Sequence, residues 1–132
     1  MNKLLKILLI LWQLPQAILG SIIYIFFKKD IKDTYQRGFV KCYFVKDFRG
    51  GISLSPFIFI NHKRLYDVNW INHEYGHYLQ SLYLGPLYLI VIGIPSGLWA
   101  FIYGRFITEE HNRYYKFYTE KWADKLGEVK RA

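Results

Sequence analysis

Two long uncharged stretches dominate the hydrophobic pattern of the chain. Residues 7–27 and 78–104 contain no Asp, Glu, Lys or Arg. An apolar run of about 18 residues or more is long enough to cross a bilayer as a helix. Each stretch also contains a helix-breaking sequence, QLPQ at 13–16 and GIPSG at 93–97. The pattern therefore predicts an integral membrane protein whose apolar helices are broken within the membrane, as kinked or re-entrant segments.

The first apolar segment, residues 4–27, is predicted to be helical with an interruption at Pro15. Proline removes a backbone hydrogen bond and bends or breaks a helix. At a rise of about 1.5 Å per residue the segment reaches about 36 Å, against about 30 Å of hydrocarbon. A kinked membrane span fits this length, and so does a hairpin of two half-depth helices. In either arrangement we expect Gln13 and Gln16 to be buried against protein.

A β-hairpin is predicted over residues 39–60. The first strand is FVKCYFVKDF (39–48), RGG (49–51) is a turn signal, and ISLSPFIFI (52–60) is the second strand. Because proline cannot donate a ladder hydrogen bond, the strand that contains Pro56 is expected at the edge of its sheet.

Helical segments are predicted for the rest of the chain, which gives an α+β fold in a single domain, 1–132. A helix over 67–84 begins at Asp67 or Asn69 and ends at Gly85-Pro86. The apolar region 86–106 is divided by GIPSG into two half-helices and forms a re-entrant hairpin. A last helix spans 108–127 and ends at Gly127.

The net charge of +8 is interpreted as membrane topology. No nucleic-acid-binding motif is recognised, so nucleic acid is excluded as a partner. Nine of the 18 Lys and Arg residues lie in 28–83 and seven lie from 105 onward. Excess Lys and Arg mark the cytoplasmic side. The distribution predicts a bacterial inner-membrane protein with both groups, and any site that they contain, on the cytoplasmic side.

The sequence HEYGH at 73–77 carries the candidate chemistry. Histidines four residues apart share one face of a helix and can bind one Zn²⁺. Glu74, next to His73, can take a proton from water that the metal activates. Together they form the H-E-x-x-H signature of zinc metalloproteases. Two histidines that merely hydrogen-bond to their neighbours would be the structural alternative, but the capped helix favours the zinc interpretation.

A catalytic zinc site needs a third protein ligand, with one position left for water. The candidates are His62, His111, Glu109, Glu110 and Glu120. Glu120 is favoured because Asp124 lies one helical turn further on. That carboxylate can accept the second N–H of a ligand histidine. An exposed charged face, with Lys121 and Lys125 in ion pairs, is the alternative for this segment.

HEYGH, taken together with EKWADKLG at 120–127, resembles the gluzincin metalloproteases. It is similar in particular to the membrane-embedded CAAX prenyl protease and HtpX-like group, although this chain is far shorter. The resemblance implies zinc as the cofactor, Glu120 as third ligand and Asp124 as support for a ligand histidine. It also implies an oxyanion-stabilising residue, for which His111 is the candidate. Arg113, Tyr114 and Tyr115 are the alternatives.

The zinc hypothesis restricts the topology of 86–106. A single crossing would place Glu120 about 30 Å from the histidines, on the opposite face of the membrane. This segment must therefore return to the side from which it started, and the sequence predicts that it turns at GIPSG.

The expected function is that of a zinc metalloendopeptidase, with Glu74 as general base and membrane-proximal or membrane-protein substrates. Because an edge strand can pair with an extended peptide, Ser53, Ser55 and Phe57 are candidate substrate contacts, although an ordinary core hairpin explains the same pattern. A catalytically inactive zinc-binding membrane protein with a structural or regulatory partner is the alternative function. Expected partners are the substrate, the lipid bilayer and other copies of the chain in a homo-oligomer.

Overall fold

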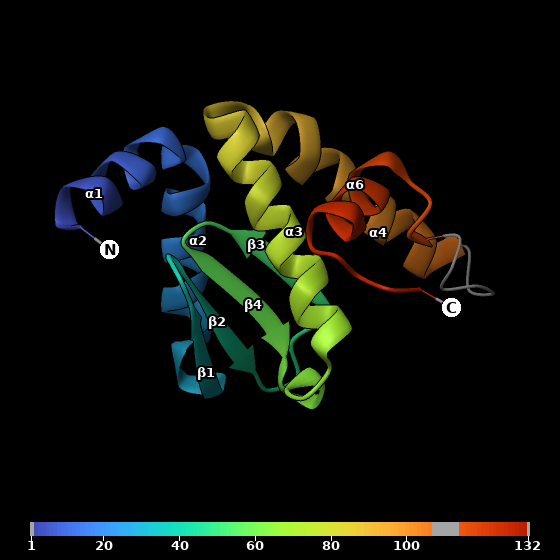
Figure 1. Cartoon of the computed structure of the whole chain (residues 1–132). Helices are drawn as coiled ribbons and strands as arrows, with labels where there is room; N and C mark the ends of the chain where they lie inside the picture. Colours follow the sequence, from blue (N-terminus) through green and yellow to red (C-terminus); the bar gives the residue numbers. More distant parts are fainter. Residues whose placement is uncertain (1, 107–113, 132) are drawn as a thin grey trace.

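The computed structural model describes residues 2–106 and 114–131, and it contains a mixed four-stranded sheet with helices on both faces (Figure 1). The strand order is β1-β2-β4-β3. β1 pairs with β2 and β3 with β4 in antiparallel fashion, whereas β2 and β4 are parallel. The strands are β1 Ile31–Arg37, β2 Val40–Val45, β3 Gly51–Leu54 and β4 Phe57–Asn61.

The predicted hairpin over 39–60 is wrong in its pairing. The segment ISLSPFIFI forms two strands, β3 and β4, which are separated by a turn at Ser55 and Pro56. The antiparallel partner of β2 is β1, which lies in a polar stretch where we predicted no strand. β1 is mostly exposed, so its sequence lacks the apolar residues by which a buried strand is recognised.

The edge predicted near Pro56 is present, but it belongs to β3 alone. Ser53 lies on this edge strand, and Ser55 lies in the turn that follows. Phe57 lies on β4, between β2 and β3 in the sheet. Of the three candidate substrate contacts, only Ser53 is therefore on a strand with a free edge among the described strands.

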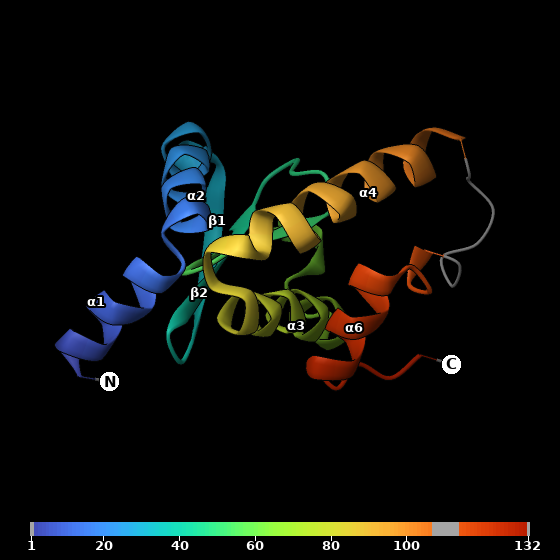
Figure 2. The ribbon, with the colours of Figure 1, turned by 90° about the horizontal axis from the view of Figure 1, so that it is seen from above.

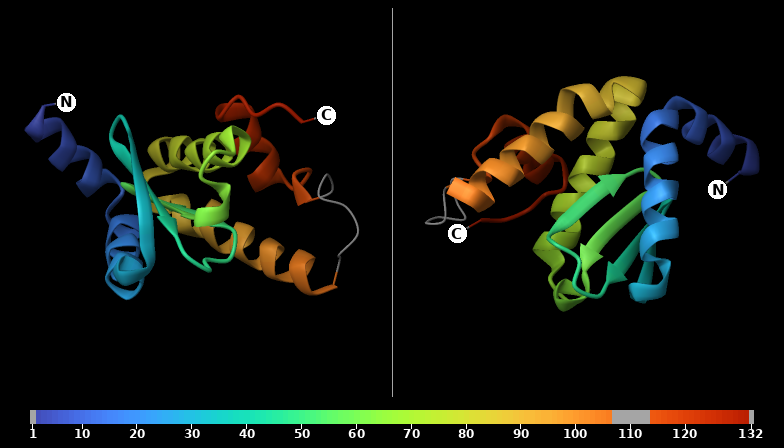
Figure 3. Two further views of the ribbon diagram at one scale, coloured as in Figure 1. Left: turned by 90° about the horizontal axis from the view of Figure 1, so that it is seen from below. Right: turned by 180° about the vertical axis from the view of Figure 1, so that it is seen from behind.

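Helices α3 (Val68–Leu84) and α2 (Leu14–Phe27) cover opposite faces of the sheet. Seen from behind, α2 crosses the face that α3 does not occupy (Figure 3). On the α3 face, Tyr78 joins a core of buried strand residues, namely Val40, Cys42, Phe44, Ile58 and Ile60. On the α2 face, the ring of Tyr24 packs against Tyr43 and Phe57. Alternate residues of β2 and β4 thus enter different layers.

The first apolar segment is two helices, α1 (Lys3–Trp12) and α2, which are bent by 96° at their junction. No single helix within residues 2–106 and 114–131 is long and apolar enough to cross a membrane. The bent pair α1 and α2, taken together, has sufficient length and apolar composition. Gln13 and Gln16 are fully buried, as predicted, and both form hydrogen bonds with Ser81 of α3.

The chain reverses direction after α3, at Gly85 and not at GIPSG. Gly85 has φ +55°, a conformation that glycine adopts without strain. A short 3₁₀ turn (Gly85–Leu87) and a π-helical turn (Leu89–Gly93) then lead directly into α4, Ile94–Phe106. The predicted re-entrant hairpin over 86–106 is therefore wrong. Pro95 lies in the first turn of α4 and has no N–H to donate to the preceding π-helical turn; the carbonyl of Val91, four residues earlier, accepts a hydrogen bond from the hydroxyl of Tyr118.

The last helix, α6, spans Tyr118–Leu126 and is shorter than the helix predicted over 108–127. Residues 115–117 form a turn and a bend before α6, while Glu109, Glu110, His111 and Arg113 lie outside the described residues. Gly127 caps α6 as predicted. Seen from above, α4 runs back from the reversal at Gly85, and α6 lies beside α3 (Figure 2). The apolar stretch thus returns Glu120 to the histidines, as the zinc hypothesis requires.

Candidate metal centre

Helices α3 and α6 touch through their backbones. A Cβ atom at Gly76 would collide with the carbonyl group of Ala123, and one at Gly127 would collide with the carbonyl of Asn72. Such close approach is possible only where side chains are absent or very small. These contacts fix the position of α6 over the middle of α3 and so determine where Glu120 lies.

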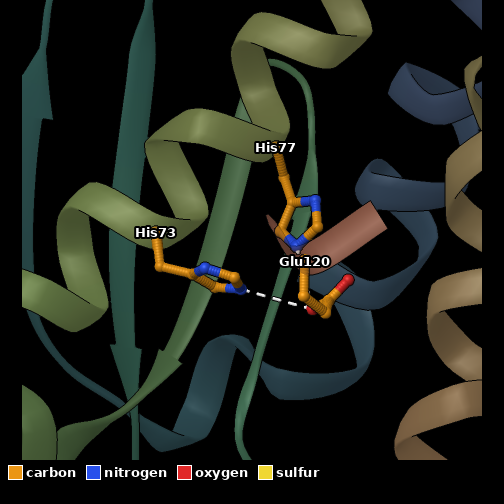
Figure 4. Close-up of side chains that lie close together, drawn as sticks. All are labelled: His73, His77 and Glu120. Atoms are coloured by element: carbon orange, nitrogen blue, oxygen red, sulfur yellow. Dashed lines mark hydrogen bonds and ion pairs between the residues drawn. The ribbon is translucent and has the colours of Figure 1, made fainter. Parts of the chain in front are cut away.

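His73 and His77 of α3 and Glu120 of α6 point toward one another (Figure 4). The Nε2 atoms of His73 and His77 lie 3.3 and 3.2 Å from the same oxygen, Glu120 Oε1. All three residues are buried, and the three potential ligand atoms lie within 4.8 Å of one another. This buried group could therefore hold a metal ion.

Hydrogen bonds at the far side of each ring fix the orientation of both histidines. His73 Nδ1 lies 2.7 Å from Asp124 Oδ1, and His77 Nδ1 lies 2.7 Å from Gln80 Oε1. The amide nitrogen of Gln80 donates to the carbonyl of Thr119, so its oxygen faces His77. Since both partners are acceptors, each Nδ1 carries a proton, so a ring that binds a metal ion would do so through the Nε2 that faces Glu120.

The carboxylate of Glu120 is oriented in a similar way. Its second oxygen, Oε2, accepts hydrogen bonds from Ser96 Oγ at 2.7 Å and Thr119 Oγ1 at 2.6 Å. Oε1 is thereby left for the histidines. Ser96 belongs to GIPSG, the sequence predicted to break the helix. In the structure Ser96 instead lies within α4 and contacts Glu120, the third candidate ligand.

The charges at the centre are strongly coupled. Burial by itself lowers the pKa of His73, but hydrogen bonds to Asp124 and Glu120 raise that pKa to about 9. Burial raises the pKa of Glu120, but His77 and His73 outweigh it and hold that pKa well below its usual range. The carboxylates thus favour positive charge at this point, from protons on the rings or from a cation between them.

The donor set fits Zn²⁺. Two imidazole nitrogens and one carboxylate oxygen are its usual protein ligands in a catalytic site, which keeps a fourth position open. Supporting acceptors behind ligand histidines are likewise usual. His62, another candidate for the third ligand, is exposed on the turn after β4 and is not part of the group.

Glu74 lies beside this centre with one oxygen that has no hydrogen-bond partner among the described residues, Oε1. Its side chain is buried, and burial raises the pKa of Glu74 above its usual value although the histidines lower it. A Cβ atom on Gly51 of β3 would lie 2.9 Å from Oε2 of Glu74. The second glycine of RGG is therefore needed for close approach to this carboxylate.

A cavity of about 810 Å³ opens in front of the centre. Its walls come from β3, α3, α4 and the segment before α6, and they include Glu74 and all three candidate ligands. A cavity of this size can accommodate a small ligand or part of a peptide. Tyr114 and Tyr115, both alternatives for the oxyanion-stabilising residue, also line it. His111 lies outside the described residues.

Sequence reasoning did not identify several residues that support the centre. Gln80 lies three residues after His77, a spacing that could have suggested the contact. Arg131 pairs with Asp124 at 3.0 Å and lies over the ring of Tyr115. Ser96 and Thr119 give no signal of this kind in the sequence.

No family model, curated protein or solved structure matches this chain. The geometry described above is therefore the basis for the functional interpretation.

Proposed function

We propose that this protein is a zinc-dependent metallopeptidase that cleaves peptide bonds of membrane-proximal or membrane-protein substrates. One observation carries the proposal: a buried carboxylate oxygen, Glu74 Oε1, which has no hydrogen-bond partner among residues 2–106 and 114–131, lies beside three converging potential ligand atoms in the wall of a cavity. A purely structural zinc site has four protein ligands and needs no such base.

Three residues of the site would bind the metal ion, and a fourth would transfer protons. His73, His77 and Glu120 would hold the ion, which supplies Lewis-acid activation of water and of a peptide carbonyl. Glu74 accepts a proton from the attacking water and returns it to the leaving nitrogen. A carboxylate whose pKa is raised by burial is suited to both transfers, because it holds a proton more readily than an exposed one.

The edge of β3 that is not paired with β4 would supply a binding site for an extended substrate. Ser53 directs its carbonyl away from β4, where it accepts a hydrogen bond from Tyr88 at 2.9 Å. In an antiparallel strand the residue two positions away has the same orientation, so Gly51 also presents its backbone to this side. Gly51 lies against Glu74. A peptide that pairs with this edge would therefore lie beside the base.

The membrane part of the proposal rests on exposed apolar side chains of α1, α2 and the segment 89–106. Ile25 and Phe26 are 66% and 78% exposed. Other strongly exposed members are Leu4, Leu8, Leu11, Ile18, Ile90, Ile94, Leu98 and Phe101. So large an apolar surface is unusual for a monomer in water. With the Lys and Arg distribution, it favours the bacterial inner membrane with the centre on the cytoplasmic side. Flotation of the protein with lipid vesicles tests this, and recovery at the bottom of the gradient would refute it.

The decisive experiment measures zinc and cleavage on the same preparation. The full chain, purified in detergent and reconstituted with metal, should hold about one equivalent of zinc and cleave β-casein. Glu74→Gln should keep the zinc and lose at least about a hundredfold in rate, the usual contribution of a general base. Glu128→Gln, an exposed change of the same kind, should affect neither.

Each result has a definite consequence. A chain without zinc is not a metallopeptidase. Zinc without cleavage in the wild type would identify the inactive zinc-binding protein that is the alternative function. Undiminished cleavage by Glu74→Gln would reject Glu74 as the base.

A further inference from the structure

Small residues make up most of the face of α4 that borders the cavity. Ser96, Gly97 and Ala100 of α4, with Gly93 just before it, recur at three- and four-residue spacing and line the cavity alongside Ile94 and Tyr103. Residues at this spacing share one side of a helix. Larger residues lie on other sides of α4, where Leu98 and Phe101 are 58% and 62% exposed. The helix thus presents its small residues to the space in front of the metal centre.

Gly97 has no structural reason to be glycine. A Cβ atom there would meet nothing within 4 Å, in contrast to Gly51 and Gly76, which are crowded by Glu74 and Ala123. Its backbone is helical, and its φ is not among the positive values of the chain. Glycine inside a helix is less favourable than alanine. Neither packing nor backbone geometry therefore requires glycine at position 97. A ligand that enters the empty space beside Gly97 would require it.

A second feature of the same cavity indicates a ligand. The hydroxyl groups of Ser53 and Tyr103, like Glu74 Oε1, are buried and have no hydrogen-bond partner in the described part of the chain. Buried polar groups of this kind are normally satisfied. The remaining walls near α4 include apolar side chains, those of Ile52, Leu54, Leu89 and Ile94. Unsatisfied polar atoms among apolar walls suit a peptide, whose backbone is polar and whose side chains can be apolar.

We propose that the space beside Gly97 is a subsite for a large apolar side chain of the substrate, so that the protein selects peptides with a residue of leucine or phenylalanine size near the cleaved bond. This inference rests on the proposed peptidase function, because it assumes that a peptide lies in the cavity. It adds the chemical class of residue that the site accepts and the position on α4 that controls it.

The test uses inhibitors that bind the metal directly. The probes are acetyl-trialanine hydroxamate and three analogues in which one alanine at a time is replaced by phenylalanine. Binding to the zinc-loaded full chain in detergent is measured by calorimetry. Burial of the larger side chain should strengthen binding about tenfold or more for one of the three analogues.

Three variants then locate the effect. In Gly97→Leu the added side chain occupies the space, so the phenylalanine analogue should bind no more tightly than the parent compound does to the same variant. Gly97→Ala should give an intermediate gain. Leu98→Phe adds bulk to α4 outside the cavity and should leave the gain unchanged. Thermal unfolding and zinc content of each variant show that the fold and centre are intact.

The failures are distinguishable. Absence of zinc would overturn the proposed function and this inference together. Zinc with equal binding of all four compounds, or a gain that survives Gly97→Leu, would overturn only the subsite. A tenfold preference that falls selectively in Gly97→Leu would establish it.

Discussion

Two buried polar clusters lie on α3, one at the metal centre and one near its C-terminal end. The first is built around His73, His77 and Glu120. The second joins Gln13 and Gln16, at the start of α2, to Ser81. All of these residues are 5% exposed or less. Burial of polar groups is therefore common to both, and burial alone does not identify a functional site.

The difference lies in the balance of donors and acceptors. In the second cluster Ser81 donates to Gln13, and Gln16 donates to Ser81 and to the carbonyl of Gly85. These groups are neutral, and only Gln16 Oε1 lacks a partner within the described chain. At the metal centre, the Nε2 atoms of two histidines converge on one oxygen of a negatively charged carboxylate. A cation would balance the charge at the metal centre, whereas the polar groups of the glutamine cluster largely satisfy one another by hydrogen bonds.

Glu120→Ala should have the largest effect and should distinguish the clusters most clearly. A structural zinc site contributes roughly 10–16 kcal/mol over four ligands, so removal of one ligand should weaken zinc binding at least about a hundredfold to a thousandfold. Gln16→Ala, in the neutral cluster, should leave zinc affinity unchanged. Competition with a metal chelator measures both. Full zinc affinity in Glu120→Ala would mean that the third ligand is another residue.

Gly76→Ala should have the next largest effect, because it forces α6 away from α3. The added methyl group collides with the carbonyl of Ala123, and overpacking of this kind costs about 1–3 kcal/mol of unfolding free energy. Gly97→Ala is the matched change at a position with free space and should stabilise the protein by up to about 1 kcal/mol. Denaturant unfolding in detergent compares them. Equal stability of the two variants would contradict the helix contact.

Asp124→Asn should weaken zinc binding about 10- to 100-fold, since residues that orient ligand histidines usually contribute this much. The neutral amide is a weaker acceptor for His73 and also loses the ion pair with Arg131. Asp67→Asn, at the N-terminus of α3, is the control because asparagine caps helices as well as aspartate does. If both variants bind zinc like the wild type, Asp124 does not support the centre.

Ser81→Ala should have the smallest effect and should leave the metal centre untouched. It removes the hydroxyl that links Gln13 to Gln16, at a cost of about 1 kcal/mol of stability. Zinc content and chelator competition should match the wild type. A loss of zinc affinity in this variant would show that the two clusters are coupled along α3.

The two residue pairs that form the candidate centre were predictable from the sequence because each pair is local. His73 and His77 lie one helical turn apart, and so do Glu120 and Asp124. Asp67 and Gly85 bound the first of these helices as expected. Such spacing depends only on helix geometry and not on the rest of the chain. The prediction failed where elements pair at a distance: β1 was missed because its residues face solvent, and the turn at GIPSG was placed ten residues too late.

The glycines show why the remainder needed the structure. Gly51, Gly76 and Gly97 look alike in the sequence. The first two are crowded, by a carboxylate and by a neighbouring helix, and the third faces empty space. Whether a glycine is crowded or faces empty space depends on segments up to about 50 residues away in the sequence. The positions of those segments result from packing of the whole chain.

The sequence by itself determined the types of ligand and their local spacing, since helical periodicity fixes which side chains share a face. Tertiary structure decided that α6 lies on α3, that Ser96 and Gln80 orient the ligands, and that β3 and α4 enclose a cavity. These contacts join residues on different elements, and only the close packing of those elements against one another brings them within hydrogen-bonding distance.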